Sequence, residues 1–433
     1  MMNSHPLRSE LHDETHGRPR PAITLPHAIA HVAMVHSGQS RACPQALLDF
    51  CAARGIEPPA PGDVHFAAEV GALRLRWEWR REYHEYTAYA CECDAEQPFG
   101  PNEADRLLET LLANETGQVI AALRLAVLAD DASGANEARA DRLLRTDDGM
   151  GAGALIGASI MDNAAEIYSD FRLDAAGFGR FLLIGRDTRP HQLGRSVQRI
   201  IDIEVGRMMA MLAYPEARDL TNVLREIEST LSGLVARMDI ATSSEEPEIL
   251  QDVIRLSAEI EQMSTYSAYR LDAARSYREL VRQNLHDLRQ SRLGWLQTPT
   301  EFLERRFDPA MNFCDATNAR LKSVSERVSR ASALLGTRVE IDRERQNQEL
   351  LGAMNERAAL QLRLQETVEG LSVAAIAYYA TGLFGYVFKS AEKAGLPIKY
   401  ELVTGLAVVP IVLAVWFFMH RVRKHLSAPG EHA

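Results

Sequence analysis

The sequence predicts an α+β (or α/β) N-terminal cytoplasmic domain, a long helical or coiled-coil middle, and a C-terminal two-helix transmembrane hairpin. Strand-like and helical stretches alternate up to about residue 215, which indicates the mixed domain. Beyond residue 191 the spacing of apolar residues is almost continuously helical. Two apolar runs without ionisable side chains follow. We therefore expect domains at 1–215, 216–370 and 371–420 and a basic cytoplasmic tail at 421–433.

Composition excludes several classes of protein. The 433 residues fit two or three domains, and 46% hydrophobic with 25% charged residues is typical of a globular chain. The net charge of -11 argues against a nucleic-acid partner, because phosphate binding needs a clustered basic surface. Five cysteines, an odd number thinly spread over a long chain, do not resemble the disulfide framework of a secreted domain, so we expect free thiols.

The amino-terminal domain is predicted to mix short helices and strands. Gly55 is a plausible helix stop and Pro101 a helix start, while the alternation of Leu73, Leu75 and Trp77 is typical of a strand. The expected helices cover 6–15, 40–55 and 101–113. The expected strands lie at 29–35, within 65–93, and at 119–128, 154–161, 165–171 and 178–184.

After residue 191 we expect only helices. Pro215 separates the first two, and no proline interrupts the last one before the first apolar run. If that last helix is unbroken from Pro309 to Phe388, it is about 120 Å long. The alternative is two or three shorter helices, broken near Gly336 or Gly352. The predicted segments are 195–212, 217–238, 247–292 and 309–388.

The last helix carries two apolar stripes. The first has the three- and four-residue spacing of a coiled-coil seam. A polar stretch separates it from the second stripe. The first consists of Leu321, Val324, Val328, Ala331 and Leu335, and the second of Leu350, Met354, Ala358 and Leu362.

The apolar runs, 371–388 and 402–419, predict two membrane-spanning helices. Each spans about 27 Å, against a hydrocarbon core of about 30 Å. Buried core helices are the alternative, but Gly405 and Pro410 would harm such helices more in water than in lipid. The intervening stretch contains Gly395 and Pro397 and predicts a turn, so both ends of the hairpin share one side.

The orientation follows from the sequence before the hairpin and from the charges beside it. The first ten residues have no apolar signal segment, so we expect the amino-terminal mass to be cytoplasmic. Basic residues near the spans agree with this arrangement. Those on the proposed inner side are Arg357, Arg363, Arg421, Arg423 and Lys424, and those in the outer loop are Lys389, Lys393 and Lys399.

Candidate polar sites have simpler interpretations than catalysis. Cys91 and Cys93 with His84 suggest half a zinc site, but no second close cysteine pair exists, and two cysteines on one strand face explain the spacing. Glu78 and Glu82 would share one face of a strand, where pairing with arginine is more common than catalysis. We predict no catalytic, cofactor or metal residues.

Two other stretches carry weak signals. Histidines with carboxylates near the start suit acid–base chemistry, but no nucleophile accompanies them. Residues 149–153 read GMGAG, which lacks the GK[ST] of a phosphate loop. The titratable residues near the start are His5, His12, Glu14, His16 and Arg18.

The first apolar run has one face of small residues. Ala377, Thr381 and Gly385 recur every four residues with Gly382 beside them, and small residues let helices approach closely in lipid. We expect this face to contact another helix. Tyr378 and Thr381 lie on a neighbouring strip that would face water in an oligomer, although no charged residue marks an ion path.

Four motifs resemble one protein family over almost the whole chain. The first contains His5, Pro6, Leu7, Arg8, Glu14, His16, Arg18 and Pro19. The second contains Trp77, Glu78, Glu82, Tyr83, Tyr86 and Thr87, with Arg80 where the family pattern has histidine. The third contains Gly194, Arg195, Gln198, Arg199, Ile203, Glu204, Arg207, Met208 and Met209, and the fourth covers 337–379. They resemble a family of uncharacterised, predicted membrane-anchored bacterial proteins, which implies a membrane anchor and assigns no reaction. We expect this anchor to lie in the bacterial inner membrane.

The layout is also similar to that of CorA-type magnesium channels. In that family a Gly-Met-Asn motif at the end of the first span forms the pore mouth, and the outer loop is typically acidic. Residues 381–386 read TGLFGY here, and the outer loop carries three lysines and two glutamates. The selectivity element is missing, so the similarity concerns layout alone.

Two functions are compatible with these observations. The first is a non-enzymatic, membrane-anchored interaction or scaffold protein that forms a homo-oligomer in the lipid bilayer. The alternative is a CorA-like channel for a divalent cation or another small solute, with Tyr378 and Thr381 lining the pore. An enzyme in the amino-terminal domain ranks third and would need a cleft gathering His16, Arg18, Glu78 and Glu82.

Overall fold

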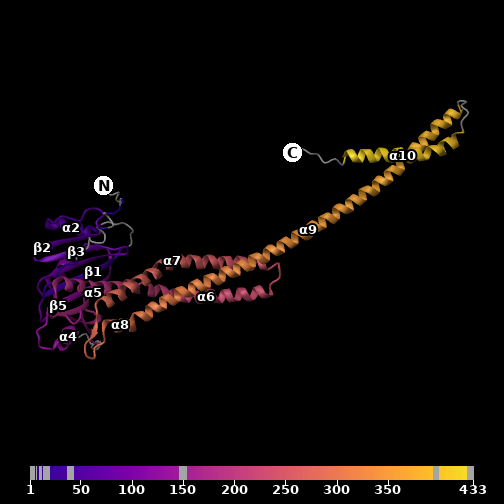
Figure 1. Cartoon of the computed structure of the whole chain (residues 1–433). Coiled ribbons are helices and arrows are strands. Elements are labelled where there is room, and N and C mark those ends of the chain that lie inside the picture. Colours follow the sequence, from indigo (N-terminus) through magenta and orange to yellow (C-terminus); the bar gives the residue numbers. More distant parts are fainter. Residues whose placement is uncertain are drawn as a thin grey trace. The chain divides into compact units, whose positions relative to one another are not determined.

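The computed structural model describes residues 5, 7–8, 12, 20–36, 43–145, 154–393 and 399–426, with side chains given as far as residue 421. Contacts divide the chain into two units (Figure 1). Unit 1 comprises Met1–Ile240 and Glu248–Ala333, and unit 2 comprises Ala241–Pro247 and Leu334–Ala433. The expected helix at 6–15, the GMGAG run and most of the tail at 421–433 lie largely or wholly outside the described residues.

One sheet of nine strands forms the centre of unit 1 within the described residues. Its order is β2-β3-β4-β1-β5-β8-β7-β6-β9, and only β5 and β8 pair in parallel among neighbouring strands. Strands lie in each predicted region, although β4 ends at Ala90, before Cys91 and Cys93, and the two-residue β9 lies in a part of the chain where only helices were predicted. The strands are β1 (His27–Val35), β2 (His65–Val70), β3 (Leu73–Trp79), β4 (Tyr83–Ala90), β5 (Gln118–Ala129), β6 (Ile156–Ile160), β7 (Ala165–Leu173), β8 (Gly179–Gly185) and β9 (Ser291–Arg292).

Helices cover both faces of this sheet. On one face, α2 (Gln45–Arg54) and α3 (Glu103–Leu112) pack on Leu75 and Trp77, and α4 (Asn136–Leu144) packs on the ends of β5 and β8. The opposite face carries α5 (Pro190–Met211), whose Gln198 contacts Arg76. Because side chains alternate along β3, its apolar residues face α2 and α3 and its charged residues face α5.

Local sequence explains where these helices begin and end. Asn102 caps α3 by accepting a hydrogen bond from the backbone N–H of Asp105. Gly55 ends α2 in the left-handed conformation at φ 65°, as its position in the sequence predicts. The short helix α4 was not predicted, since its apolar residues Ala140 and Leu144 complete little more than one repeat.

The helical part of unit 1 contains α6 (Ala213–Ile240), most of α7 (Glu246–Asp287), α8 (Pro299–Arg306) and the first part of α9 (Asp308–Lys393). Arg320 of α9 pairs with Glu228 of α6, and Arg278 of α7 pairs with Asp308. The predicted seam is buried beside these contacts, which places it inside a helical bundle of one chain. The seam residues in unit 1 are Leu321, Val324, Val328 and Ala331, and Leu335, which is also buried, belongs to unit 2.

Unit 2 contains the rest of α9 and α10 (Tyr400–Leu426), which follows it (Figure 1). The helix α9 continues through Gly336 and Gly352 without a break, which contradicts the alternative of several shorter helices. Both helices contain segments long and apolar enough to cross a membrane, and almost none of those segments is buried. Pro410 lies inside α10, where a proline is tolerated more readily in lipid than in water.

Candidate functional site

Charged residues occupy the sheet face beneath α5. The strand register places Arg76 opposite Thr87 and Glu78 opposite Glu85. On the next strand, His31 of β1 lies opposite the same Thr87. Like charges directly opposite each other destabilise a sheet, so the pair of glutamates needs a cation between them.

Arg80 supplies that cation. Its Nη2 donates to Glu78 Oε2 at 2.8 Å and to Glu85 Oε1 at 3.3 Å. Arg76 pairs with the other oxygen of Glu78 and donates to Gln198 Oε1 at 3.1 Å. The bond from Arg76 to Gln198 links the sheet to α5, and Gln198 in turn donates to Asp202 Oδ1 of the same helix at 3.0 Å. We call these residues the charge cluster: His31, Arg76, Glu78, Arg80, Glu85, Gln198 and Asp202.

His31 is the most deeply buried member of the charge cluster. Its Nδ1 lies 2.9 Å from Thr87 Oγ1, while its Nε2 has no hydrogen-bond partner and lies 3.9 Å from Glu85 Oε2. Burial, and then the charges of Arg76 and Arg80, lower the pKa of His31 to about 3. Burial raises the pKa of Asp202, and the charge of Glu85 adds to that rise.

The charge cluster is arranged to hold α5 on the sheet. Glu78 and Glu85 are only 5% and 4% exposed, and arginines occupy both, so neither is offered to a substrate as a base. His31 is neutral at physiological pH and completely buried. Buried polar groups bound to each other in this way make the packing of two elements specific, although they stabilise it little.

Two residues of different family motifs, Glu78 and Gln198, belong to the charge cluster, where both contact Arg76. Trp77 lies in the core on the opposite face of the sheet. Glu82 was predicted to share a strand face with Glu78, but this was wrong because β3 ends at Trp79. Glu82 lies in the following turn and pairs with Arg270 of α7 at 2.5 Å.

The other motif residues lie elsewhere. Arg199 pairs with Asp287 at 3.4 Å, and Glu204 pairs with Arg207 along α5. His5 and Arg8 are exposed. Three further motif residues, Glu14, His16 and Arg18, lie outside the described residues, so the cleft required by the enzyme hypothesis is not shown.

Sequence reasoning missed most members of the charge cluster. Arg76 and Glu78 alternate with apolar Leu75 and Trp77, a pattern that indicates a polar strand face. What the pattern does not reveal is that α5 covers this face. Arg80 stands where the resembling motif has histidine, and here it bridges two carboxylates instead of exchanging protons.

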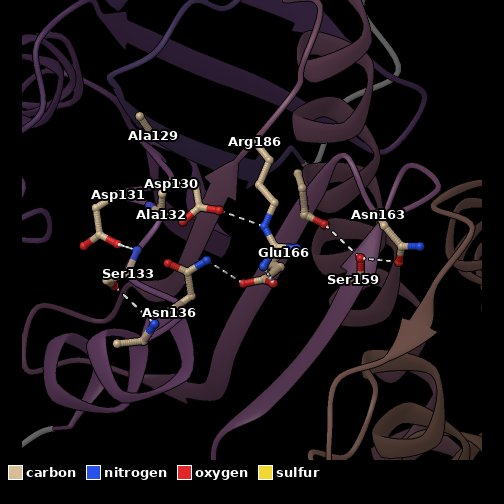
Figure 2. A network of polar contacts seen from close by, with 12 residues as sticks. Ala129, Asp130, Asp131, Ala132, Ser133, Asn136, Ser159, Asn163, Glu166 and Arg186 are labelled. Carbon is tan, nitrogen blue, oxygen red and sulfur yellow. Dashed lines mark hydrogen bonds and ion pairs between the residues drawn. The ribbon is translucent and has the colours of Figure 1, made fainter.

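A second polar network lies where β5 and β8 end at the same edge of the sheet (Figure 2). Arg186, just after β8, donates to Asp130 Oδ2 at 2.8 Å and also pairs with Glu166. Asn136 and Tyr168 both donate to Glu166 Oε2, at 2.9 and 2.8 Å. Each of the two carboxylates is therefore held by fixed donors.

An open pocket of about 680 Å³ adjoins this network. The helices after β5 and β8 lie on opposite faces of the sheet, and such a switch point is where open α/β sheets commonly bind ligands. The pocket is lined by two aspartates and two arginines, namely Asp130, Asp131, Arg139 and Arg142. The described residues thus form a pocket of mixed charge that selects no single ligand class.

Cys91 and Cys93 do not lie on a strand. The strand interpretation was wrong, because β4 ends at Ala90 before Cys91 and Cys93. Cys91 is exposed, 3.9 Å from His27 Nε2, and burial raises the pKa of Cys93 to about 11, which suppresses its thiolate. Among the residues that the structure describes, no three His, Cys, Asp or Glu side chains are placed to hold a metal ion.

The small residues of the first apolar run lie partly against α10. Ala377 is 5% exposed, and a Cβ built on Gly385 would lie 3.3 Å from Thr404 Cγ2. Thr381 Oγ1 donates to the Ala377 carbonyl at 2.7 Å. Tyr378 is 77% exposed, and a Cβ on Gly382 would meet nothing within 4 Å, so these two point away from α10.

A family model described as "Protein of unknown function (DUF3422)" matches residues 3–426. The match covers nearly the whole chain and includes all four sequence motifs. No curated protein matches the chain.

Proposed function

Because this chain belongs to the DUF3422 family, whose function is unknown, we propose from its geometry that it is a membrane-anchored interaction protein. The observation that carries this proposal is the exposure of the apolar helices in unit 2. Leu371 and Leu383 of α9 are 75% and 67% exposed, and Leu406 and Phe417 of α10 are 81% and 61% exposed. Lipid is the environment that such surfaces require.

The energetic cost of leaving these helices in water supports the same conclusion. Burying one large apolar side chain contributes about 1.5–3 kcal/mol, so about ten such residues at partial exposure account for roughly 10–20 kcal/mol. A whole domain is typically stable by about 5–15 kcal/mol. The exposed apolar surface is therefore comparable with the entire net stability of a domain.

We place the hairpin in the bacterial inner membrane, with unit 1 and the carboxyl tail in the cytoplasm. The basic residues beside the cytoplasmic ends of the two spans outnumber those in the outer loop by five to three, which supports this orientation. We propose that the chain forms a homo-oligomer. An interaction role suits unit 1 because arginines hold the carboxylates of the charge cluster and of the second polar network. These groups make the packing of unit 1 specific, which leaves the surface of unit 1 as the part that contacts partners.

Alkaline carbonate extraction of membranes from cells making the full chain tests the anchor. The protein should remain in the pellet and leave it only with detergent, and recovery in the carbonate supernatant would contradict the proposal. Orientation is tested at exposed Cys91. A membrane-impermeant thiol reagent should label it only after the inner membrane is opened, whereas labelling of intact spheroplasts would overturn the cytoplasmic placement.

The second candidate function is a CorA-like channel. The favouring observation is that α9 runs as one helix from Asp308 to Lys393, through the first apolar run. Against it, the Thr381 hydroxyl is already bonded to its own helix. Flux of Mg²⁺ into liposomes holding the full chain, and its loss in Thr381→Leu, would support the channel, and flux equal to that of empty vesicles would remove it.

A further inference from the structure

We propose that copies of this chain associate side by side, in parallel, through one stripe of α9 just before the first apolar run. The parallel orientation rests on the proposed membrane anchor, since a hairpin in lipid gives every copy the same direction and depth. The stripe follows alternating steps of four and three residues, the spacing of a coiled-coil seam. It consists of Asn347, Leu351, Met354, Ala358, Gln361, Gln365 and Val368, and we call it the membrane-proximal stripe.

No part of the described chain covers this stripe. Every side chain from Arg343 to Val368 is exposed, and Leu351, Met354 and Val368 are 63%, 58% and 58% exposed. A helix of about seven turns with an uncovered row of apolar residues is only marginally stable in water, because most helical stability in proteins comes from packing an apolar face.

The stripe is distinct from the one that packs inside unit 1. At about 100° per residue, Met354 lies about 100° and Leu351 about 160° around the helix from buried Leu335. A helix that simply continued its contacts with α6 and α7 would keep its apolar residues in one phase. The change of phase indicates a different partner for the membrane-proximal stripe.

The alternating four- and three-residue spacing of the membrane-proximal stripe continues into the first apolar run, on the side of α9 away from α10. Its next positions include Tyr379, Gly382 and Tyr386, and the two tyrosines are 71% and 74% exposed. Ala377 and Gly385, which lie against α10, are on another side of the helix. One continuous surface of α9 therefore remains open to another copy in water and in lipid, where Gly382 permits close approach.

The polar residues of the stripe point to an identical partner. Asn347, Gln361 and Gln365 carry amides that both donate and accept, so each can bond to its own counterpart at the same height on a parallel copy. Lipid or an unrelated apolar helix would leave these amides unpaired, at a cost of about 1–3 kcal/mol each. Apolar Leu350, Leu362 and Leu364 flank the stripe, a width that suits a bundle of more than two helices.

Disulfide trapping of the full chain in its native membranes tests the proposal. In a Cys91→Ser background, Leu351→Cys and Met354→Cys place a thiol in the stripe, and Glu349→Cys and Glu356→Cys place one on the far side of the same helix. Mild oxidation should give a cross-linked pair of this chain at least ten times more abundant for the stripe variants. Equal yields, no cross-link, or a cross-link to a protein of another mass would each overturn the proposal.

A second measurement separates assembly from folding and from anchoring. Met354→Lys should lower the mass of the detergent-solubilised particle to that of one chain. The mass of the Glu356→Lys particle should stay unchanged, and so should the helical circular dichroism. An unaltered mass for Met354→Lys would contradict the stripe. If carbonate instead releases a chain that still cross-links at Leu351, the anchor fails and the self-association surface stands.

Discussion

Replacing Arg80 by alanine should destabilise the sheet of unit 1 strongly and in a pH-dependent manner. The change leaves Glu78 and Glu85, 5% and 4% exposed, opposite each other without the guanidinium that bridges them. Removing one partner of a buried ion pair costs about 3–5 kcal/mol. Because Arg80 is itself 29% exposed and Arg76 still contacts Glu78, we expect a loss of about 2–4 kcal/mol.

The assay is urea unfolding of the full chain in detergent, followed by the fluorescence of Trp77 and Trp79 in the sheet. A loss of this size should lower the midpoint by about 1–2 M urea. The deficit should shrink on acidification, because protonating one glutamate removes the repulsion.

Arg74→Ala on the same strand is the matched control. Arg74 pairs with Glu69 at 3.5 Å on the surface, where an ion pair contributes at most about 1 kcal/mol. Equal effects of the two variants, or a deficit for Arg80→Ala that grows at low pH, would refute the reasoning.

Two further predictions concern the same unit. The pKa of about 3 for His31 lies below its ordinary 6.5, so the contribution of neutral His31 to stability is complete above about pH 6.5 and is lost as the pH falls toward 3. His31→Gln should therefore flatten the plot of unfolding free energy against pH in this range. An unchanged slope would contradict the prediction. A Cβ on Gly194 would overlap the carbonyl oxygen of Pro21, so Gly194→Ala should cost about 3 kcal/mol or prevent folding. Gly233→Ala, in open space on α6, should instead raise the thermal midpoint by a gain of about 0.5–1 kcal/mol, and similar melting of the two alanine variants would disprove the contact.

Local patterns were sufficient for most elements of the fold. Alternation in β3 and the glycine stop at Gly55 depend on residues close in sequence, so they can be predicted from sequence alone. The helix α4 is too short to show a repeated period. Cys91 and Cys93 were misassigned because nothing in their spacing marks the end of β4 at Ala90.

The candidate sites depended on contacts that the sequence does not encode locally. Arg76 and Gln198 are far apart in the chain and meet only because α5 follows β8 onto that face of the sheet. The buried seam and the membrane-proximal stripe of α9 also show that local sequence does not reveal what covers a helix. Leu321 and Leu351 lie in similar patterns, yet one is buried by the chain's own helices and the other is exposed.

The central claim is that lipid surrounds the apolar segments of α9 and α10. Spin labels at Leu383, Leu406 and Leu413, in proteoliposomes of the full chain, test it directly, with Glu349 as a control on the same chain. Dissolved O2, which is apolar, should collide with the first three labels more often than a water-soluble nickel complex does. At Glu349 the nickel complex should collide more often than O2. A nickel complex that reaches Leu406 as readily as Glu349 would contradict the claim.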